Sequence, residues 1–128
     1  MNGYFDIALN LASDRFLGDR EKVITNAISH NVNFFNIVCS SIDELDFVKD
    51  LNSRFRENSC FTLGVHPHNA NELNEDNLQS LKDSIKMHHP SAVGETGLDF
   101  FRNLSSFENQ INAFEQQIKI SIENNLPL

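Results

Sequence analysis

The residues best suited to chemistry follow two short apolar runs of the chain. Glu95 stands two positions after the run at residues 92–93, with a glycine just before it and another two positions after it. His66 and His68 follow residues 60–65 and flank a proline. Glycine permits unusual backbone angles and close approach of a ligand, and barrel and α/β folds place catalytic groups at the C-terminal ends of strands. We therefore expect Glu95 to bind a metal ion, with His66 and His68 beside it at a neighbouring strand end.

Strand-like and helix-like segments alternate along the whole sequence. The predicted strands are residues 4–11, 32–39, 60–65 and 92–93, so a strand begins about every 30 residues. The predicted helices are residues 19–30, a helix from Ser41 to Phe55, a helix capped by Asn74 and ended at residues 88–90, and a helix that starts at Ser105 and closes at residues 124–125. Regular alternation predicts parallel strands with right-handed crossovers.

Two predicted helix starts carry the capping-box pattern, in which a serine is followed three residues later by a glutamate. The pairs are Ser41 with Glu44 and Ser105 with Glu108. The last helix has the clearest apolar face of all, formed by Phe107, Ile111, Phe114, Ile118 and Ile122. Residues 126–128 resemble the opening of a further strand.

Two architectures fit four strand–helix units in 128 residues. One is a small doubly wound sheet, and the other is half of a (β/α)₈ barrel, which needs about 250 residues in full. Periodicity does not choose between them. We expect residues 1–128 to form a single domain. In a half barrel the first and fourth strands would be open edges, and Val32, Phe34 and Val93 would be exposed on the uncovered sheet face.

Composition narrows the partners and the compartment. The formal net charge of −8 argues against non-specific nucleic-acid binding through a basic surface, although bound metal ions can supply a local positive field. The only two cysteines, Cys39 and Cys60, are expected to be small core residues in a reducing compartment. The first residues lack a basic signal-peptide start, and no apolar run approaches the ~20 residues that span a bilayer. The sequence therefore predicts a cytoplasmic protein without a membrane partner.

Several motifs together resemble the TatD family of metal-dependent deoxyribonucleases. They are GVHPH at residues 64–68, GETGLDF at residues 94–100, FDIALNL at residues 5–11, RN at residues 102–103 and ENQ at residues 108–110. The resemblance covers the whole chain and matches the amino-terminal half of the family. It implies the first four units of a (β/α)₈ barrel of the metal-dependent hydrolase class, and hydrolysis of phosphodiester bonds in DNA, often as a 3′-to-5′ exonuclease.

The resemblance also assigns the site. It implies that Glu95 holds a divalent metal ion, with Mg²⁺ expected and Mn²⁺ or Zn²⁺ as alternatives. His66, His68 and Arg102 are candidates to orient the phosphate. Asn10 lies where the family usually carries a metal-binding histidine of its first strand and is assigned to substrate binding. A neutral amide is a weak ligand for a transition metal, so this departure removes a usual ligand.

The chain also stops at Leu128, before the strand that bears further metal ligands in the family. One carboxylate alone binds Mg²⁺ weakly, so we expect little or no nuclease activity from this chain by itself. Three alternatives stay open. The chain could be a non-catalytic remnant, a split partner that pairs with a missing carboxy-terminal half, or a related hydrolase of amides or esters. Its open edges favour self-association or pairing with another chain.

Overall fold

Four parallel strands alternate with helices in the computed structural model, which describes residues 3–128. Residues 1–2, part of the start that lacks a signal-peptide pattern, lie outside the described residues. The elements in chain order are β1 (Tyr4–Leu9), η1 (Asp14–Phe16), α1 (Arg20–Ser29), β2 (Val32–Ile37), η2 (Ile42–Glu44), α2 (Leu45–Arg54), β3 (Ser59–Leu63), η3 (Pro67–Glu72), α3 (Glu75–His88), β4 (Ala92–Val93) and α4 (Phe107–Asn124). Within residues 3–128 no helix has the length and apolar character needed to cross a membrane.

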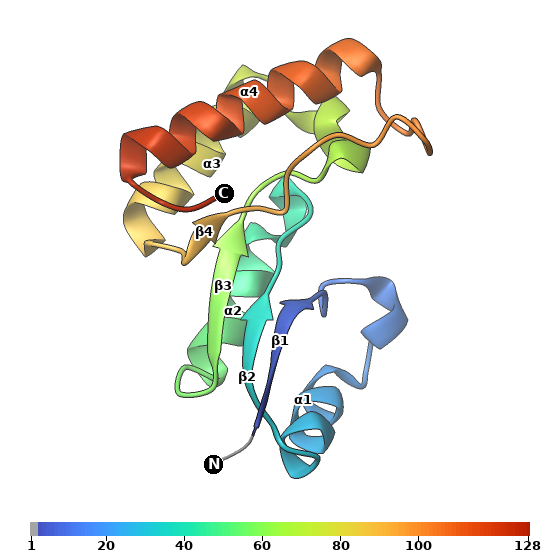
Figure 1. Ribbon diagram of the computed structural model, residues 1–128, viewed down its shortest axis with the longest axis vertical. Helices are drawn as coiled ribbons and strands as arrows, with labels where there is room; N and C mark the ends of the chain where they lie inside the picture. Colours follow the sequence, from blue (N-terminus) through green and yellow to red (C-terminus); the bar gives the residue numbers. More distant parts are fainter. Residues whose placement is uncertain (1–2) are drawn as a thin grey trace.

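The strands lie side by side in chain order, β1-β2-β3-β4, and the sheet curls (Figure 1). A doubly wound sheet would reverse its strand order part-way across, and this sheet does not. The result is a curled half-barrel, which confirms the expected fold class. The predicted edge at β4 is partly covered, because the Val93 amide donates to the Pro127 carbonyl at 2.9 Å. Residues 126–128 thus run beside β4, where a further strand was expected to open.

One face of the sheet packs against the helices and forms the core. Alternate residues of β2 and of the segment after it, Phe35, Ile37 and Cys39, are buried, as are Leu63 and Val65 from β3 and its end. They pack with buried residues of α2 and α3, chiefly Leu45, Val48, Leu51, Leu81 and Ile85. Val38 and Thr62 are buried as well, at 4% and 6% exposed, so the period-two pattern expected for one covered face holds within β2 and is lost toward the strand ends.

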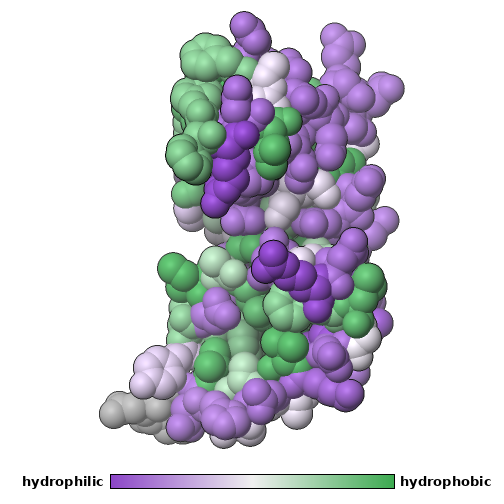
Figure 2. All heavy atoms as spheres, turned by 90° about the vertical axis from the view of Figure 1, so that its right-hand side faces the viewer, coloured by the Kyte–Doolittle hydropathy of each residue, from purple (hydrophilic) through white to green (hydrophobic). Residues whose placement is uncertain are grey.

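The other face of the sheet is open. Phe5 and Ile7 of β1 and Phe34 of β2 are exposed, and the rings of Phe5 and Phe34 meet edge to face at 5.3 Å. Figure 2 shows hydrophobic side chains gathered over the lower half of the molecule, where β1 lies in Figure 1. The exposure expected for Phe34 is confirmed. That expected for Val32 is wrong, since Val32 is half-buried and packs against the core, and that expected for Val93 is wrong too. Val93 is 1% exposed because it points into the helix-side core.

The helix ends follow local capping chemistry. Asn74 caps α3 as expected, with its side chain accepting the Asn77 amide at 2.9 Å, and Asn125 ends α4 in the left-handed conformation. Both capping boxes are wrong in detail. The cap of α4 is Ser106, one residue later than predicted, because the Ser105 hydroxyl donates instead to the His68 carbonyl at 2.7 Å.

The glutamate of the first predicted box also has another partner. Glu44 Oε2 accepts the amide of Ser40, not that of Ser41, at 2.6 Å. Ser41 makes no side-chain capping bond, and the chain runs through the 3₁₀ turn η2 before α2 begins. The glutamate therefore serves the end of the preceding strand instead of the start of the helix.

The face by which α4 packs differs from the apolar stripe read in the sequence. Its buried residues are Gln110, Ala113, Gln117, Ile120 and Ser121. Phe107 and Ile122, the two ends of the predicted stripe, are 56% and 73% exposed, and the three residues between them are half-buried. The helix turns its glutamines inward because they pair with backbone groups of the loops beneath, as described below.

The two cysteines are free thiols in different surroundings. Cys39 is fully buried, as expected, and burial raises the pKa of its thiol to about 11. Cys60 is only half-buried, and its thiol donates to Asn36 Oδ1 at 3.4 Å, so its expected place in the core is wrong. The high pKa of Cys39 makes that thiol a poor nucleophile at neutral pH.

Candidate functional site

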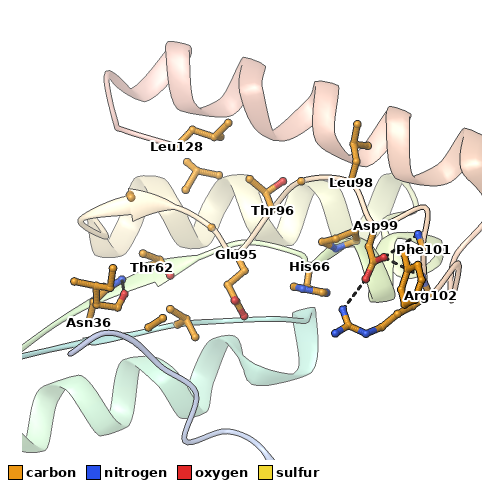
Figure 3. A pocket seen from close by; sticks show the side chains of 18 residues that line it. Asn36, Thr62, His66, Glu95, Thr96, Leu98, Asp99, Phe101, Arg102 and Leu128 are labelled. Atoms are coloured by element: carbon orange, nitrogen blue, oxygen red, sulfur yellow. Dashed lines mark hydrogen bonds and ion pairs between the residues drawn. The ribbon is translucent and has the colours of Figure 1, made fainter.

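The C-terminal ends of the strands meet at one edge of the sheet. Glu95 follows β4, His66 follows β3, Ser40 follows β2 and Asn10 follows β1. Backbone hydrogen bonds tie these ends together, since the Glu95 amide donates to the Cys39 carbonyl at 2.8 Å and the His66 amide to the Ser40 carbonyl at 2.9 Å. Figure 3 shows Glu95 and His66 projecting from neighbouring strand ends into the same pocket.

Gly64 makes the approach of Glu95 possible. A Cβ atom at Gly64 would lie 2.6 Å from the Gly94 carbonyl carbon and 2.7 Å from the Glu95 carbonyl oxygen. Both neighbours are backbone atoms, which cannot turn away as a flexible side chain can. Only glycine therefore lets the end of β3 pack this closely against the segment that carries the carboxylate.

Ser40 connects the strand ends, and sequence reasoning missed it. Its hydroxyl donates to Glu95 Oε2 at 3.0 Å and accepts from Asn10 Nδ2 at 3.4 Å. Its amide donates to Glu44 Oε2 at 2.6 Å, and its carbonyl accepts from Asn69 Nδ2 at 2.9 Å. Its position directly after the apolar run 32–39, much as Glu95 closely follows 92–93, was the available signal. Asn10 and Glu95 are thus joined through one hydroxyl.

His68, Asp99 and Arg102 form a charged cluster beside the strand ends. Asp99 Oδ2 lies 2.6 Å from His68 Nε2 and accepts from Arg102 Nη1 at 2.9 Å. Asp99 Oδ1 accepts the amides of Arg102 at 3.0 Å and Phe101 at 3.1 Å. The Arg102 amide, the His68 ring and the Arg102 guanidinium hold the pKa of Asp99 well below its usual range. The carboxylate therefore stays ionised and fixes both His68 and Arg102.

The ring of His66 is oriented by its own loop. His66 Nδ1 accepts the His68 amide at 3.1 Å, so in the neutral ring the proton lies on Nε2. Burial, and then the neighbouring His68, lower the pKa of His66. The rings of His66 and His68 meet edge to face at 4.2 Å. His66 therefore offers a neutral Nε2–H donor at the end of β3.

Two buried glutamines of α4 hold the two loops of the site. Gln117 Oε1 accepts the Val65 amide at 2.8 Å, and its Nε2 donates to the Val65 carbonyl at 3.0 Å. Gln110 does the same for Asp99, accepting its amide at 2.8 Å and donating to its carbonyl at 3.2 Å. Sequence reasoning included Gln110 in the ENQ motif without giving it a role and missed Gln117, although their spacing of seven residues places them on one face of the helix. They position His66 and Asp99 through the backbone.

Two open pockets meet at these side chains. One, of about 750 Å³, extends along the open sheet face, and the other, of about 760 Å³, extends toward Asn10 and Arg15. Glu95, His66 and Arg102 line both. The first pocket contains two buried hydroxyls, those of Thr62 and Thr96, that have no hydrogen-bond partner among the described residues. The predicted site residues Glu95, His66, His68, Arg102 and Asn10 all line the second pocket.

The residues present do not complete a metal site. No group of three His, Cys, Asp or Glu side chains able to hold an ion occurs within residues 3–128. Glu95 has one oxygen bound by Ser40, and His68 has its Nε2 bound by Asp99. A Mg²⁺ ion needs several oxygen ligands in near-octahedral geometry, and a Zn²⁺ site needs at least three protein ligands. Glu95 can serve as one ligand of a larger set.

Known proteins share this architecture. The protein is similar to the "3′-5′ ssDNA/RNA exonuclease TatD" of Pantoea ananatis, with 37% identity over 97% of this chain and 48% of that protein, and to the protein of the same name from Dickeya dadantii, with 34% identity over 97% of this chain and 47% of that protein. The chain spans about half the length of the curated relatives it matches.

Solved structures agree with the fold. A TatD homologue of Escherichia coli, YJJV, superposes with a TM-score of 0.87 at 24% identity, over 97% of this chain and 48% of that one. An uncharacterized amidohydrolase of Saccharomyces cerevisiae gives a TM-score of 0.81 at 28% identity, over 93% of this chain and 44% of that one. A sequence model described as TatD related DNase matches residues 5–128. The chain therefore belongs to the TatD-related DNase family.

Proposed function

We propose that the chain carries the amino-terminal part of the site of a metal-dependent nuclease that hydrolyses phosphodiester bonds in single-stranded DNA or RNA from the 3′ end. The observation that supports this most is the convergence of Glu95, His66 and Arg102 on one pocket at the strand ends. The curated relatives named above act, by their names, as 3′-5′ exonucleases on single-stranded DNA or RNA. Because this chain belongs to the same family, we propose the same activity for it.

The residues present are suited to holding a phosphate. The Arg102 guanidinium is 64% exposed, so its free N–H groups can reach a phosphate oxygen while Asp99 holds Nη1. The Nε2–H of His66 is a neutral donor, and His68 and Asn10 line the same second pocket. Because the chain has a net charge of −8, attraction of the strand has to come from this local group of donors and from bound cations.

This chain would supply only some of the ligands of the metal ion. Glu95 is our candidate for one ligand of a divalent ion, expected to be Mg²⁺, which in such enzymes polarises the phosphate and activates water. The described residues supply no complete set of ligands. We therefore propose that the chain alone has little or no turnover, and that the remaining ligands come from residues beyond it or from another chain. The open sheet face and the edge strand β1 are the surfaces that such a partner would cover.

The test separates binding from cleavage. A 5′-labelled single-stranded oligonucleotide is incubated with the chain and Mg²⁺, Mn²⁺ or Zn²⁺, and with EDTA as the metal-free control. Anisotropy should show binding that weakens in Glu95→Gln and Arg102→Gln but not in Glu115→Gln, an exposed glutamate of α4. Gels should show little shortening of the strand. Turnover like that of a full-length relative would overturn the proposed inactivity, and absence of binding would overturn the proposed substrate.

Hydrolysis of an amide or ester is a second candidate, and the Saccharomyces cerevisiae neighbour named an amidohydrolase favours it. The two candidates differ in what the pocket must hold, because a phosphodiester needs cationic donors and a neutral amide does not. Competition of inorganic phosphate with the ligand would support the nuclease. Binding of small amides that is unaffected by Arg102→Gln would support the amidohydrolase.

A further inference from the structure

An exposed aromatic side chain stands at the mouth of the site. Phe101, in the loop between β4 and α4, is 95% exposed, the highest exposed fraction of any large hydrophobic side chain among the described residues. Its neighbour Phe100 is used differently, because its ring stacks on Phe107 at 4.7 Å with an interplanar angle of 27°. Figure 2 shows a group of hydrophobic side chains at the upper left, by this loop. One phenylalanine thus anchors the loop and the next is left free.

The loop that presents Phe101 is held firmly. Asp99 Oδ1 accepts the amide of Phe101 at 3.1 Å, and Gln110 grips the amide and the carbonyl of Asp99 from the buried face of α4. The Phe100 ring adds a packing contact on Phe107. The exposure of Phe101 therefore does not follow from a loose loop. It is a ring held out into solvent by a fixed backbone.

Phe101 also belongs to the pocket of the candidate site. Phe101 and Arg102 line the same pocket as Glu95 and His66, and Figure 3 shows the two side chains at one end of it. Proteins that bind single strands combine cationic groups for the phosphates with aromatic rings on which bases stack. Here a guanidinium fixed by Asp99 is next in sequence to a free ring. Both parts of that combination are present within two consecutive residues.

We propose that Phe101 is a stacking platform for a base of single-stranded nucleic acid whose phosphate is held at Arg102. The proposal rests on the proposed function and adds how the strand is recognised. Every base has a flat π face, so the contact would be tolerant of sequence and would favour unpaired over paired strands. A double helix keeps its bases stacked on one another and does not offer them to a single ring.

Phe101 could instead be covered by a segment of another protein. That contact would need only an apolar side chain at position 101, whereas stacking of a base needs the aromatic ring. The Phe101→Leu variant keeps the hydrophobicity and removes the π face, and Phe101→Tyr keeps the ring. Since the side chain is exposed, neither change should disturb folding, which circular dichroism verifies. Phe5→Leu, at an exposed phenylalanine of β1, is the matched control.

The experiment measures binding of a phosphorothioate-linked oligothymidylate, which resists cleavage, and of a strand of equal length with abasic positions. Wild type and Phe101→Tyr should bind the thymidylate strand about 5- to 160-fold more tightly than the abasic strand, the range expected for one stacked base. Phe101→Leu should bind both strands alike, and Phe5→Leu should behave as wild type. Equal binding of the thymidylate strand by Phe101→Leu and wild type would overturn the platform and leave the proposed function standing. If wild type binds neither strand, both fail.

Discussion

Gln117 pairs with Val65 through both backbone groups of that residue, as a neighbouring strand would. The side chain accepts the Val65 amide at 2.8 Å and donates to its carbonyl at 3.0 Å. Val65 lies just past the end of β3, one residue before His66. Gln117 and Val65 are 0% and 1% exposed, so water cannot take the place of the glutamine. The helix therefore satisfies both backbone groups of the residue that precedes His66.

Replacing Gln117 by Leu should lower the free energy of unfolding by about 2–5 kcal/mol, because two buried backbone groups lose their partners. Urea unfolding followed by circular dichroism measures the change. Gln116→Leu is the matched control, since its side chain makes only a long contact to Asn112 at 3.5 Å, and it should change stability by less than about 0.5 kcal/mol. Equal effects of the two substitutions would contradict the role of Gln117.

Gly64→Ala should destabilise the protein by about 1–3 kcal/mol, because the new methyl group meets backbone atoms of residues 94 and 95. The strand ends would have to separate, so oligonucleotide binding should weaken as well. Gly94→Ala is the control for glycine replacement, since a Cβ atom there has its nearest neighbour at 4.0 Å. Chemical denaturation and anisotropy report the two effects, and a neutral Gly64→Ala would show that the strand ends can move apart freely.

The lowered pKa of Asp99 predicts a specific pH dependence. A carboxylate with a lowered pKa in the folded state contributes stability that is present above its unfolded pKa, about 3.9, and is lost as the pH falls toward its folded pKa. The stability difference between wild type and Asp99→Asn should shrink as the pH falls below about pH 4. Parallel urea titrations at each pH measure it. A difference that grows on acidification below about pH 4 would have the wrong sign.

The open sheet face predicts self-association that depends on its apolar residues. Ile7 is 71% exposed beside Phe5, on the face that no helix covers. Ile7→Thr should shift the sedimentation coefficient toward that of a monomer at a given concentration, with little effect on folding. Ile28→Thr, on the surface of α1 and 38% exposed, should leave association unchanged. A wild-type chain that sediments as a compact monomer at all concentrations would contradict this prediction.

The sheet could be predicted because each of its strands is recognisable from a short stretch of sequence. Each strand is an apolar run bounded by turn residues, and the alternation of strands and helices dictates a parallel sheet. Strand ends then mark candidate positions, and these include Glu95 and His66, which line one pocket. Asn74 at the start of α3 was likewise recognisable, since a cap depends on residues three positions apart.

Contacts between distant segments could not be predicted in the same way. The face by which α4 packs is fixed by the hydrogen bonds of Gln110 to Asp99 and of Gln117 to Val65. The spacing of apolar residues within the helix carries no information about these bonds to other segments. The residues next to Ser40 in sequence do not show that the ends of other strands lie beside it in the fold. Val93 looked exposed because a two-residue strand does not show in sequence which of its residues faces the helices.

Ser40 has a mechanical consequence for any ligand that reaches Glu95. Its single hydroxyl proton is already given to Glu95 Oε2, while its amide and carbonyl are committed to Glu44 and His66. A cation that takes over the Glu95 oxygen would force that hydroxyl to rotate, and the nearest side chain joined to it is Asn10, from the far edge strand. A change at Glu95 would thus reach Asn10, at the end of β1, through this one hydroxyl.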